Sequence, residues 1–190
     1  MVKHTFFALS IGLIIFFLYL MQYTGAFKSV PIAIDERGPY TMLAAAHTGP
    51  YHKIVEKIEF VENWAKKNNF KCRLSFGEYL DNPRISEEGR LRSYGGCLID
   101  PLVPMELTML NEMKSSLPKE IEIREFPKTK AVVALFTGAP GIGPMKVYPK
   151  AEDFMKDGSL QPSGTVLEIY EVLGHEKNKM TTTYIWPLSK

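Results

Sequence analysis

The sequence offers little that would support metal, redox or nucleic-acid chemistry. It contains two cysteines and four histidines among 190 residues. No Cys/His spacing resembles a zinc site, so we predict no metal and no cofactor. Basic and acidic residues number 23 and 21, which leaves a net charge of +2. This balance argues against a nucleic-acid partner, which usually requires a clustered basic face.

Sequence motifs of phosphate loops and catalytic nucleophiles are also missing. The glycine-rich stretch 138–143 is followed by Pro144 where a phosphate loop has lysine, so it predicts a turn. No serine or cysteine stands in a nucleophile elbow. His47 and His52 flank a Thr-Gly turn, but their spacing fits no familiar metal or haem site. We therefore interpret both as structural histidines.

The two cysteines, Cys72 and Cys97, fall on adjacent predicted strands as either a disulfide or two buried thiols. If Leu80 pairs with Leu91, Cys72 sits opposite Ile99, two residues from Cys97. That offset would stretch the Cα separation beyond the usual window of about 4.4–6.8 Å. The register favours separate thiols and leaves the disulfide as the alternative.

A long apolar run is present at the N-terminus. No charged residue lies between Thr5 and Phe27, and as a helix this run would be about 34 Å long. It predicts a transmembrane anchor within residues 1–30, followed by a ligand-binding domain at 31–190. A cleaved signal peptide ending near Ala26 is the alternative. The short basic N-tail favours a single-pass membrane protein with its domain outside the cytoplasm.

The remaining chain repeats one pattern. An apolar run ends in Thr48-Gly49 with Glu78 downstream, and a second run ends in Thr137-Gly138 with Glu168 downstream. Each half is predicted to be β-α-β-β, at about residues 31–100 and 120–190. We expect an α+β fold, with two helices on a largely antiparallel sheet and the halves related by a pseudo-two-fold axis. The seam between the halves is a natural place for a ligand pocket.

The repeat also suggests site residues. Strand alternation places Glu168 on the same face as Val166 and Tyr170. A carboxylate on an aromatic face is costly to bury unless a cation or a hydrogen-bond donor meets it. This pattern suits a cationic or amphipathic ligand between aromatic walls, although a solvent-facing glutamate is the alternative. The predicted ligand-binding residues are Glu168, Tyr170, Tyr51, Phe76, Tyr94 and Trp186.

Four motifs follow one another in the duplicated region: HTGPYHKI (His47–Ile54), GEYLDNPR (Gly77–Arg84), LRSYGGCLI (Leu91–Ile99) and LEIYEVL (Leu167–Leu173). In this order the chain resembles the GyrI-like small-molecule-binding superfamily, which includes effector-binding domains of multidrug-responsive transcription activators and the SOUL proteins. The resemblance implies a ligand-contacting glutamate on the penultimate strand, here Glu168.

The apolar N-terminus and the YLDNP loop are similar to the membrane-anchored branch of that superfamily, which includes the testis-expressed ER-phagy receptor of animals. That receptor has a long acidic tail, whereas this chain stops at Lys190, so we do not expect its autophagy role here. No helix-turn-helix precedes the domain, so transcriptional activation is not expected either.

Three functions follow from these patterns. The first is a membrane-tethered binding module that holds a small hydrophobic or cationic molecule between its halves, without catalysis. The second is a hydrolase of small molecules with Glu168 as general base, an activity that the resemblance to soluble relatives keeps open. The third is a protein-interaction adaptor that uses the sheet edge or the Asp81–Arg90 loop.

Overall fold

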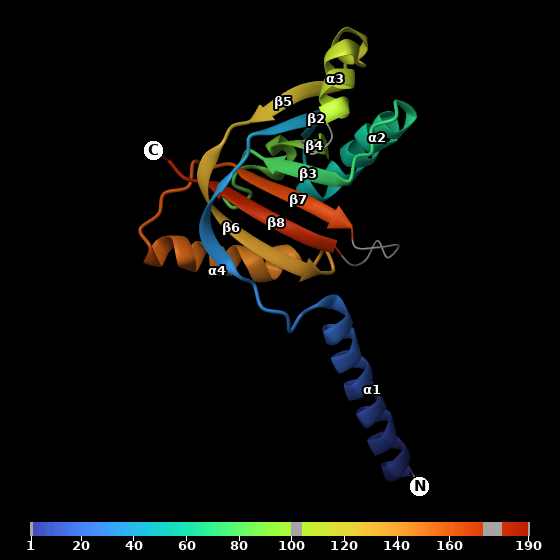
Figure 1. Cartoon of the computed structure of the whole chain (residues 1–190). Coiled ribbons are helices and arrows are strands. Elements are labelled where there is room, and N and C mark those ends of the chain that lie inside the picture. Colours follow the sequence, from blue (N-terminus) through green and yellow to red (C-terminus); the bar gives the residue numbers. More distant parts are fainter. Residues whose placement is uncertain (1, 100–103, 173–179, 190) are drawn as a thin grey trace.

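The structure is a computed structural model that describes residues 2–99, 104–172 and 180–189 (Figure 1). Its helices are α1 (Val2–Thr24), α2 (Ile54–Lys67), α3 (Pro104–Met113) and α4 (Gly143–Asp157), with 3₁₀ turns η1 (Tyr51–Lys53), η2 (Glu88–Arg90) and η3 (Lys114–Ser116). Its strands are β1 (Ile32–Arg37), β2 (Tyr40–Thr48), β3 (Leu74–Tyr79), β4 (Arg92–Leu98), β5 (Glu122–Phe126), β6 (Thr129–Gly138), β7 (Val166–Val172) and β8 (Met180–Pro187).

The eight strands form one antiparallel sheet in the order β1-β6-β8-β7-β3-β4-β2-β5. β1 leads into β2 but pairs with β6, and β5 leads into β6 but pairs with β2. The two connections meet, because a Cβ on Gly38 would lie 2.7 Å from the carbonyl oxygen of Pro127. The sheet therefore curls back on itself, as Figure 1 shows.

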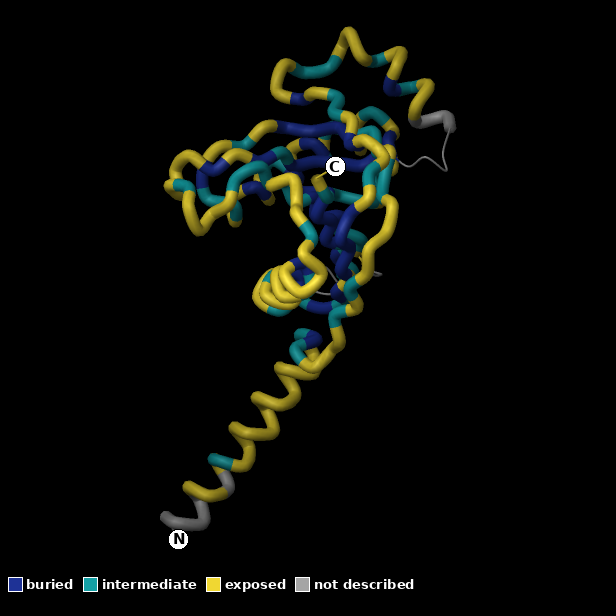
Figure 2. The backbone as a smooth tube through the Cα atoms, turned by 90° about the vertical axis from the view of Figure 1, so that its left-hand side faces the viewer, coloured by how far each residue is buried: buried dark blue, intermediate teal, exposed yellow. Residues whose placement is uncertain are grey.

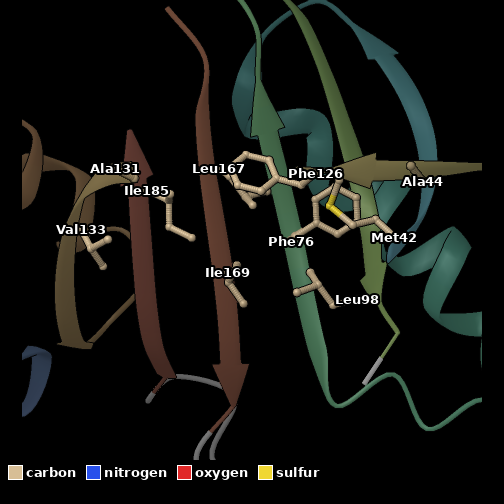
Figure 3. Close-up of a cluster of buried hydrophobic side chains, with 10 residues drawn as sticks. All are labelled: Met42, Ala44, Phe76, Leu98, Phe126, Ala131, Val133, Leu167, Ile169 and Ile185. Carbon is tan, nitrogen blue, oxygen red and sulfur yellow. The ribbon is translucent and has the colours of Figure 1, made fainter. Parts of the chain in front are cut away.

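A cluster of apolar side chains fills the inside of the curl. Figure 3 shows these side chains converging from strands at both ends of the sheet. Phe76 and Leu167 of the two central strands are fully buried in it. The whole cluster consists of Met42, Ala44, Phe76, Leu98, Phe126, Ala131, Val133, Leu167, Ile169 and Ile185. This inner face is core.

The outer face of the sheet carries α2 and α4. Val61 and Ala65 of α2 pack with Leu43 of β2, in the half that α2 covers. Val147 of α4 packs with Val132 of β6, in the other half. The structure is thus α+β, with the unit β-α-β-β occurring as β2-α2-β3-β4 and β6-α4-β7-β8. The central strands β3 and β7 lie between the two helices.

The N-terminal helix α1 projects from the sheet, and most of its described side chains are exposed (Figures 1 and 2). No helix in the described part of the chain is both long enough and apolar enough to cross a membrane. This finding contradicts the predicted transmembrane anchor and the membrane localisation that rested on it.

The C-terminal end of α1 is attached to the corner between β6 and α4. The Ala139 N–H donates to the Thr24 carbonyl at 3.0 Å. The Lys146 ammonium of α4 donates to the carbonyl oxygens of Gly25, Ala26 and Lys28. These contacts satisfy carbonyl groups that the end of a helix and its linker would otherwise leave without partners.

Cys72 and Cys97 form a disulfide, with a Cα–Cα separation of 5.5 Å. The prediction of two separate thiols is therefore wrong. Cys72 lies before β3, which begins at Leu74, and it adopts a left-handed backbone conformation with φ 44°. Cys72 therefore lies outside the β3–β4 ladder, so strand register does not set its distance to Cys97.

Reducing this disulfide should lower the free energy of unfolding by about 3 kcal/mol, because it closes a loop of sequence separation 25. Urea unfolding with and without dithiothreitol measures the difference. The Cys72→Ser/Cys97→Ser double variant is the control, and dithiothreitol should not change its free energy of unfolding. Equal stability of the oxidised and reduced natural chain would contradict a stabilising role.

Candidate functional site

Glu168 lies in the middle of β7 on the outer face of the sheet. Its neighbours Leu167 and Ile169 belong to the inner core, so strand alternation turns Glu168 to the side of the helices. The residue is 5% exposed. Directly opposite it in the β3–β7 ladder stands Gly77. A carboxylate is thus buried at the centre of the seam between the two halves.

Three tyrosines form a hydrogen-bonded chain with the carboxylate. Tyr148 of α4 donates to Glu168 Oε1 at 2.7 Å, and Tyr170 of β7 donates to Oε2 at 3.0 Å. The hydroxyl of Tyr79 lies 2.9 Å from that of Tyr170. Because each phenol has one proton and Tyr170 already donates to Glu168, Tyr79 is the donor to Tyr170.

Burial makes the Glu168 carboxylate easier to protonate, despite these hydrogen bonds. Burial raises the pKa of Glu168 from 4.5 to about 7, and the hydrogen bonds from Tyr148 and Tyr170 only partly oppose this. Burial, followed by the negative charge of Glu168, raises the pKa of both tyrosines well above 10. Both hydroxyls therefore remain donors at neutral pH. Among the described residues, no basic side chain forms an ion pair with Glu168.

Aromatic rings flank the carboxylate on both sides. Tyr184 and Trp186 of β8 stack at 6.0 Å, and Tyr148 meets them edge-on at 5.9 and 5.5 Å. On the other side, Tyr51 meets Tyr79 edge-on at 4.7 Å. Each half thus contributes aromatic rings and tyrosine hydroxyls around one negative charge.

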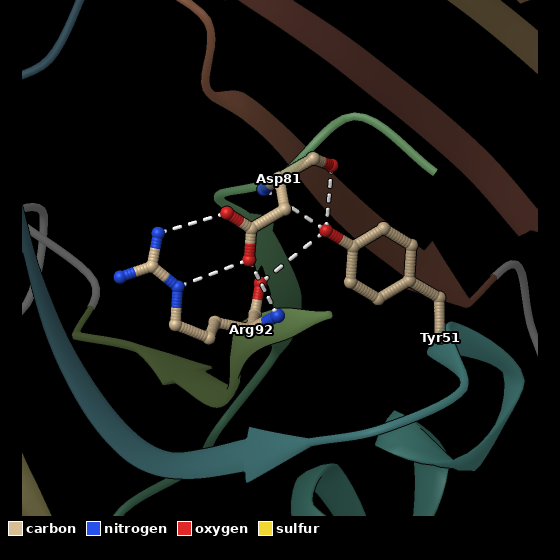
Figure 4. Close-up of polar contacts among 3 residues, drawn as sticks. All are labelled: Tyr51, Asp81 and Arg92. Atoms are coloured by element: carbon tan, nitrogen blue, oxygen red, sulfur yellow. Dashed lines mark hydrogen bonds and ion pairs between the residues drawn. The ribbon is translucent and has the colours of Figure 1, made fainter. Parts of the chain in front are cut away.

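Tyr51 is held in place by the start of the β3–β4 loop (Figure 4). Its hydroxyl donates to the Asp81 carbonyl at 2.7 Å and accepts from the Asp81 N–H at 3.0 Å. Arg92 in turn binds the Asp81 carboxylate with its guanidinium group at 2.8 and 3.0 Å. These bonds fix the ring of Tyr51 against Tyr79.

The duplicated scaffold is asymmetric at the site. Gly77 pairs with Glu168, and Tyr79 and Tyr170 each follow two residues later on their own strands. A Cβ on Gly77 would lie 2.8 Å from the Tyr79 hydroxyl oxygen and 3.1 Å from that of Tyr170. Gly77 therefore leaves the space in which the two hydroxyls meet. The counterpart of Glu168 across the axis is Gly77.

Glu78, which the sequence repeat matched with Glu168, points to the other face. It shares the inner face with Phe76 and forms an ion pair with Arg124 at 2.8 Å. The Arg124 guanidinium lies 3.7 Å from the centre of the Tyr94 ring. The assumption that the two glutamates hold matching positions is wrong, because the structural equivalence of β3 and β7 is offset by one residue from the sequence match.

The structure brings four of the six predicted ligand-binding residues together: Glu168, Tyr170, Tyr51 and Trp186. It places Phe76 and Tyr94 with the inner core. The predicted ligand-binding residues did not include Gly77, Tyr79 or Tyr148. The Gly77-x-Tyr79 and Glu168-x-Tyr170 spacing was a signal for the first two, whereas nothing local marks Tyr148 of α4 as a partner of Glu168.

The chain matches no known family model and no curated protein. Its fold is similar to the EcmrR C-terminal domain, with a TM-score of 0.62, 12% identity, and coverage of 85% of this chain and 98% of that one. The structure of EcmrR in a DNA complex has a TM-score of 0.60 and 12% identity, with coverage of 100% of this chain and 69% of that one. The structure of SAV2435 bound to tetraphenylphosphonium has a TM-score of 0.50 and 10% identity, with coverage of 84% of this chain and 94% of that one. These similarities show that the chain has the fold of the EcmrR C-terminal domain, and they do not show the membrane-anchored branch.

The buried carboxylate should make stability depend on pH. The pKa of Glu168 is higher in the folded chain than its ordinary value of 4.5, so its stabilising contribution is complete below pH 4.5 and is lost as pH rises through about 7. Between pH 5 and 8, this group should lower the free energy of unfolding by about 2.5 kcal/mol. Urea unfolding across this range measures the slope.

The Glu168→Gln variant should lack this slope. Glu171→Gln is a matched control, because Glu171 is on the same strand with a side chain 42% exposed. It should keep the slope of the natural chain. Identical slopes in all three proteins would show that Glu168 has an ordinary pKa.

Proposed function

We propose that this protein binds a small apolar cation against Glu168, in the seam between α2 and α4. One observation carries the proposal: a buried carboxylate is held by tyrosine hydroxyls, and no basic group among the described residues neutralises it. Burying a charge without a counter-charge is costly. A cation from outside the chain would supply the missing counter-charge.

The surroundings of the carboxylate favour a cation with an apolar body. Tyr148, Tyr184 and Trp186 on one side and Tyr51 and Tyr79 on the other present rings rather than charged groups. Such rings attract a cation by about 0.5–2 kcal/mol each. They also remove the apolar part of a ligand from water.

The fold supports this choice of ligand class. The structure of SAV2435 bound to tetraphenylphosphonium has the same fold, and tetraphenylphosphonium is a permanent cation with apolar substituents. At 10% identity the similarity concerns the fold alone, so the ligand is proposed for this chain on the strength of its own carboxylate and rings. Tetraphenylphosphonium is therefore a reasoned first probe.

Replacing Glu168 with glutamine should weaken tetraphenylphosphonium binding at least tenfold at pH 8, because glutamine keeps the shape and removes the charge. Isothermal titration calorimetry measures the dissociation constant. Glu171→Gln removes a charge from the same strand, outside the seam, and should leave it unchanged. Equal affinities for the natural chain and Glu168→Gln would rule out the electrostatic role.

Affinity for the same probe should also depend on pH, because the probe does not titrate and Glu168 does. Only the ionised carboxylate attracts the cation, and its pKa is about 7. Affinity should therefore fall about 20-fold from pH 7.5 to 5.5, as the ionised fraction falls. Titrations at both pH values measure the ratio. A pH-independent affinity, or the same decline in Glu168→Gln, would contradict the prediction.

A hydrolase is the second candidate, favoured by the same raised pKa. A carboxylate whose pKa is near 7 is suited to accept a proton from water at neutral pH. Incubation with electrophilic small molecules, followed by mass spectrometry, tests for turnover. Hydrolysis lost in Glu168→Gln would support catalysis, whereas turnover that survives the substitution would exclude Glu168 as the base.

A further inference from the structure

The loop between β3 and β4, residues 80–91, touches both halves of the domain at the site. It begins directly after Tyr79 and ends before Arg92. At its start, Asp81 bonds to Tyr51, which precedes α2. Further along, the Arg84 guanidinium forms an ion pair with Glu152 of α4 at 3.0 Å. The loop therefore links the two helical elements that flank Glu168.

The first attachment of the loop is firm. The backbone carbonyl and N–H of Asp81 both form hydrogen bonds with the Tyr51 hydroxyl, at 2.7 and 3.0 Å. The Arg92 backbone N–H and guanidinium group hold the Asp81 carboxylate at 2.7 to 3.0 Å. The base of the loop is thus fixed to both strands and to the start of the α2 segment (Figure 4).

The second attachment is weak. The side chains of Arg84 and Glu152 are 68% and 46% exposed, and exposed ion pairs contribute little. Between the attachments, the N–H groups of Arg84 and Ser86 bond to Asn82 at 2.9 and 3.1 Å, so the tip is a preformed turn. Such a turn can move as a unit when the Arg84–Glu152 ion pair breaks.

The position of the weak attachment ties the loop to the site. Glu152 follows Tyr148 by four residues, so both lie on the same side of α4. Tyr148 is the residue of α4 that donates to Glu168. A carboxylate that is 5% exposed can be reached only when part of its surroundings moves. Of the contacts that join the halves here, Arg84–Glu152 is the most exposed.

We propose that residues 80–91 form a lid over the Glu168 site, fixed at Asp81 and Arg92 and latched to α4 by the Arg84–Glu152 ion pair. The ligand-exchange part of this proposal rests on the proposed function. Opening breaks the latch and lets an apolar cation pass between Tyr51 and Tyr148. Closing returns Arg84 to Glu152.

A latch and a binding contact have different kinetic signatures. In the Arg84→Glu variant, the association and dissociation rate constants of tetraphenylphosphonium should both rise about two- to fivefold, with the dissociation constant unchanged. The charge-swapped double variant Arg84→Glu/Glu152→Arg should restore both rates. Stopped-flow tryptophan fluorescence of the full chain measures them.

The matched control is Arg90→Glu. Arg90 lies in the same loop, but its ion pair is with Glu87 and stays within the loop. It should leave both rate constants unchanged. A change in the dissociation rate constant alone for Arg84→Glu, or equal effects of Arg84→Glu and Arg90→Glu, would overturn the lid.

A distance measurement tests the latch without ligand. Ile85 and Met145 are 84% and 75% exposed, and the natural cysteines are bonded to each other, so cysteines introduced at these two positions accept spin labels. Pulsed electron paramagnetic resonance should show a broader, longer distance distribution after Arg84→Glu, and the original one after the charge swap.

The two tests separate failure of the lid from failure of the proposed function. An unchanged distance distribution overturns the lid whether or not the probe binds. If tetraphenylphosphonium does not bind the natural chain, the proposed function is wrong. The distance measurement alone then tests the lid. A broadened distribution with unchanged rates shows that the loop opens without gating and also overturns the lid.

Discussion

The carboxylate of Glu168 is the group on which the arrangement of this site depends. Burial raises its pKa to about 7, and tyrosine hydroxyls rather than a basic group keep it in place. Such a charge is tolerated only while donors meet both of its oxygens, so Tyr148 and Tyr170 are required together. Since Tyr148 comes from α4 and Tyr170 from β7, the carboxylate also links α4 to a central strand of the sheet.

Duplication built a scaffold whose symmetry stops at the site. The two central strands pair so that Tyr79 and Tyr170 meet above the axis, yet the pair beneath them is Gly77 and Glu168. A second glutamate at Gly77 would set two carboxylates side by side, and like charges so close cannot both ionise. A glycine there gives the tyrosines room and leaves one charge. One half thus supplies space and the other supplies the charge.

Much of the scaffold could be predicted from local patterns, because they report which residues share a face. The spacing of Ile54, Ile58 and Val61 is typical of an amphipathic helix such as α2, and alternation predicted that Glu168 and Tyr170 share a face. Alternation does not say which of the two faces meets the helices. For this reason Phe76 and Tyr94, two of the predicted ligand-binding residues, were found in the inner core. The role of Tyr148 could not be predicted, because it depends on where α4 crosses β7 and β8.

The sequence by itself determined the α+β class, the repeated β-α-β-β order and the strand face that Glu168 shares with Tyr170, since periodicity and repetition are properties of neighbouring residues. Only the tertiary structure decided the register of β3 against β7 and the disulfide of Cys72 with Cys97. Both depend on contacts between residues that are distant in the sequence. The same holds for the five tyrosines around Glu168. They come from η1, β3, α4, β7 and β8, and they meet only because the sheet and the helices bring these elements together around one carboxylate.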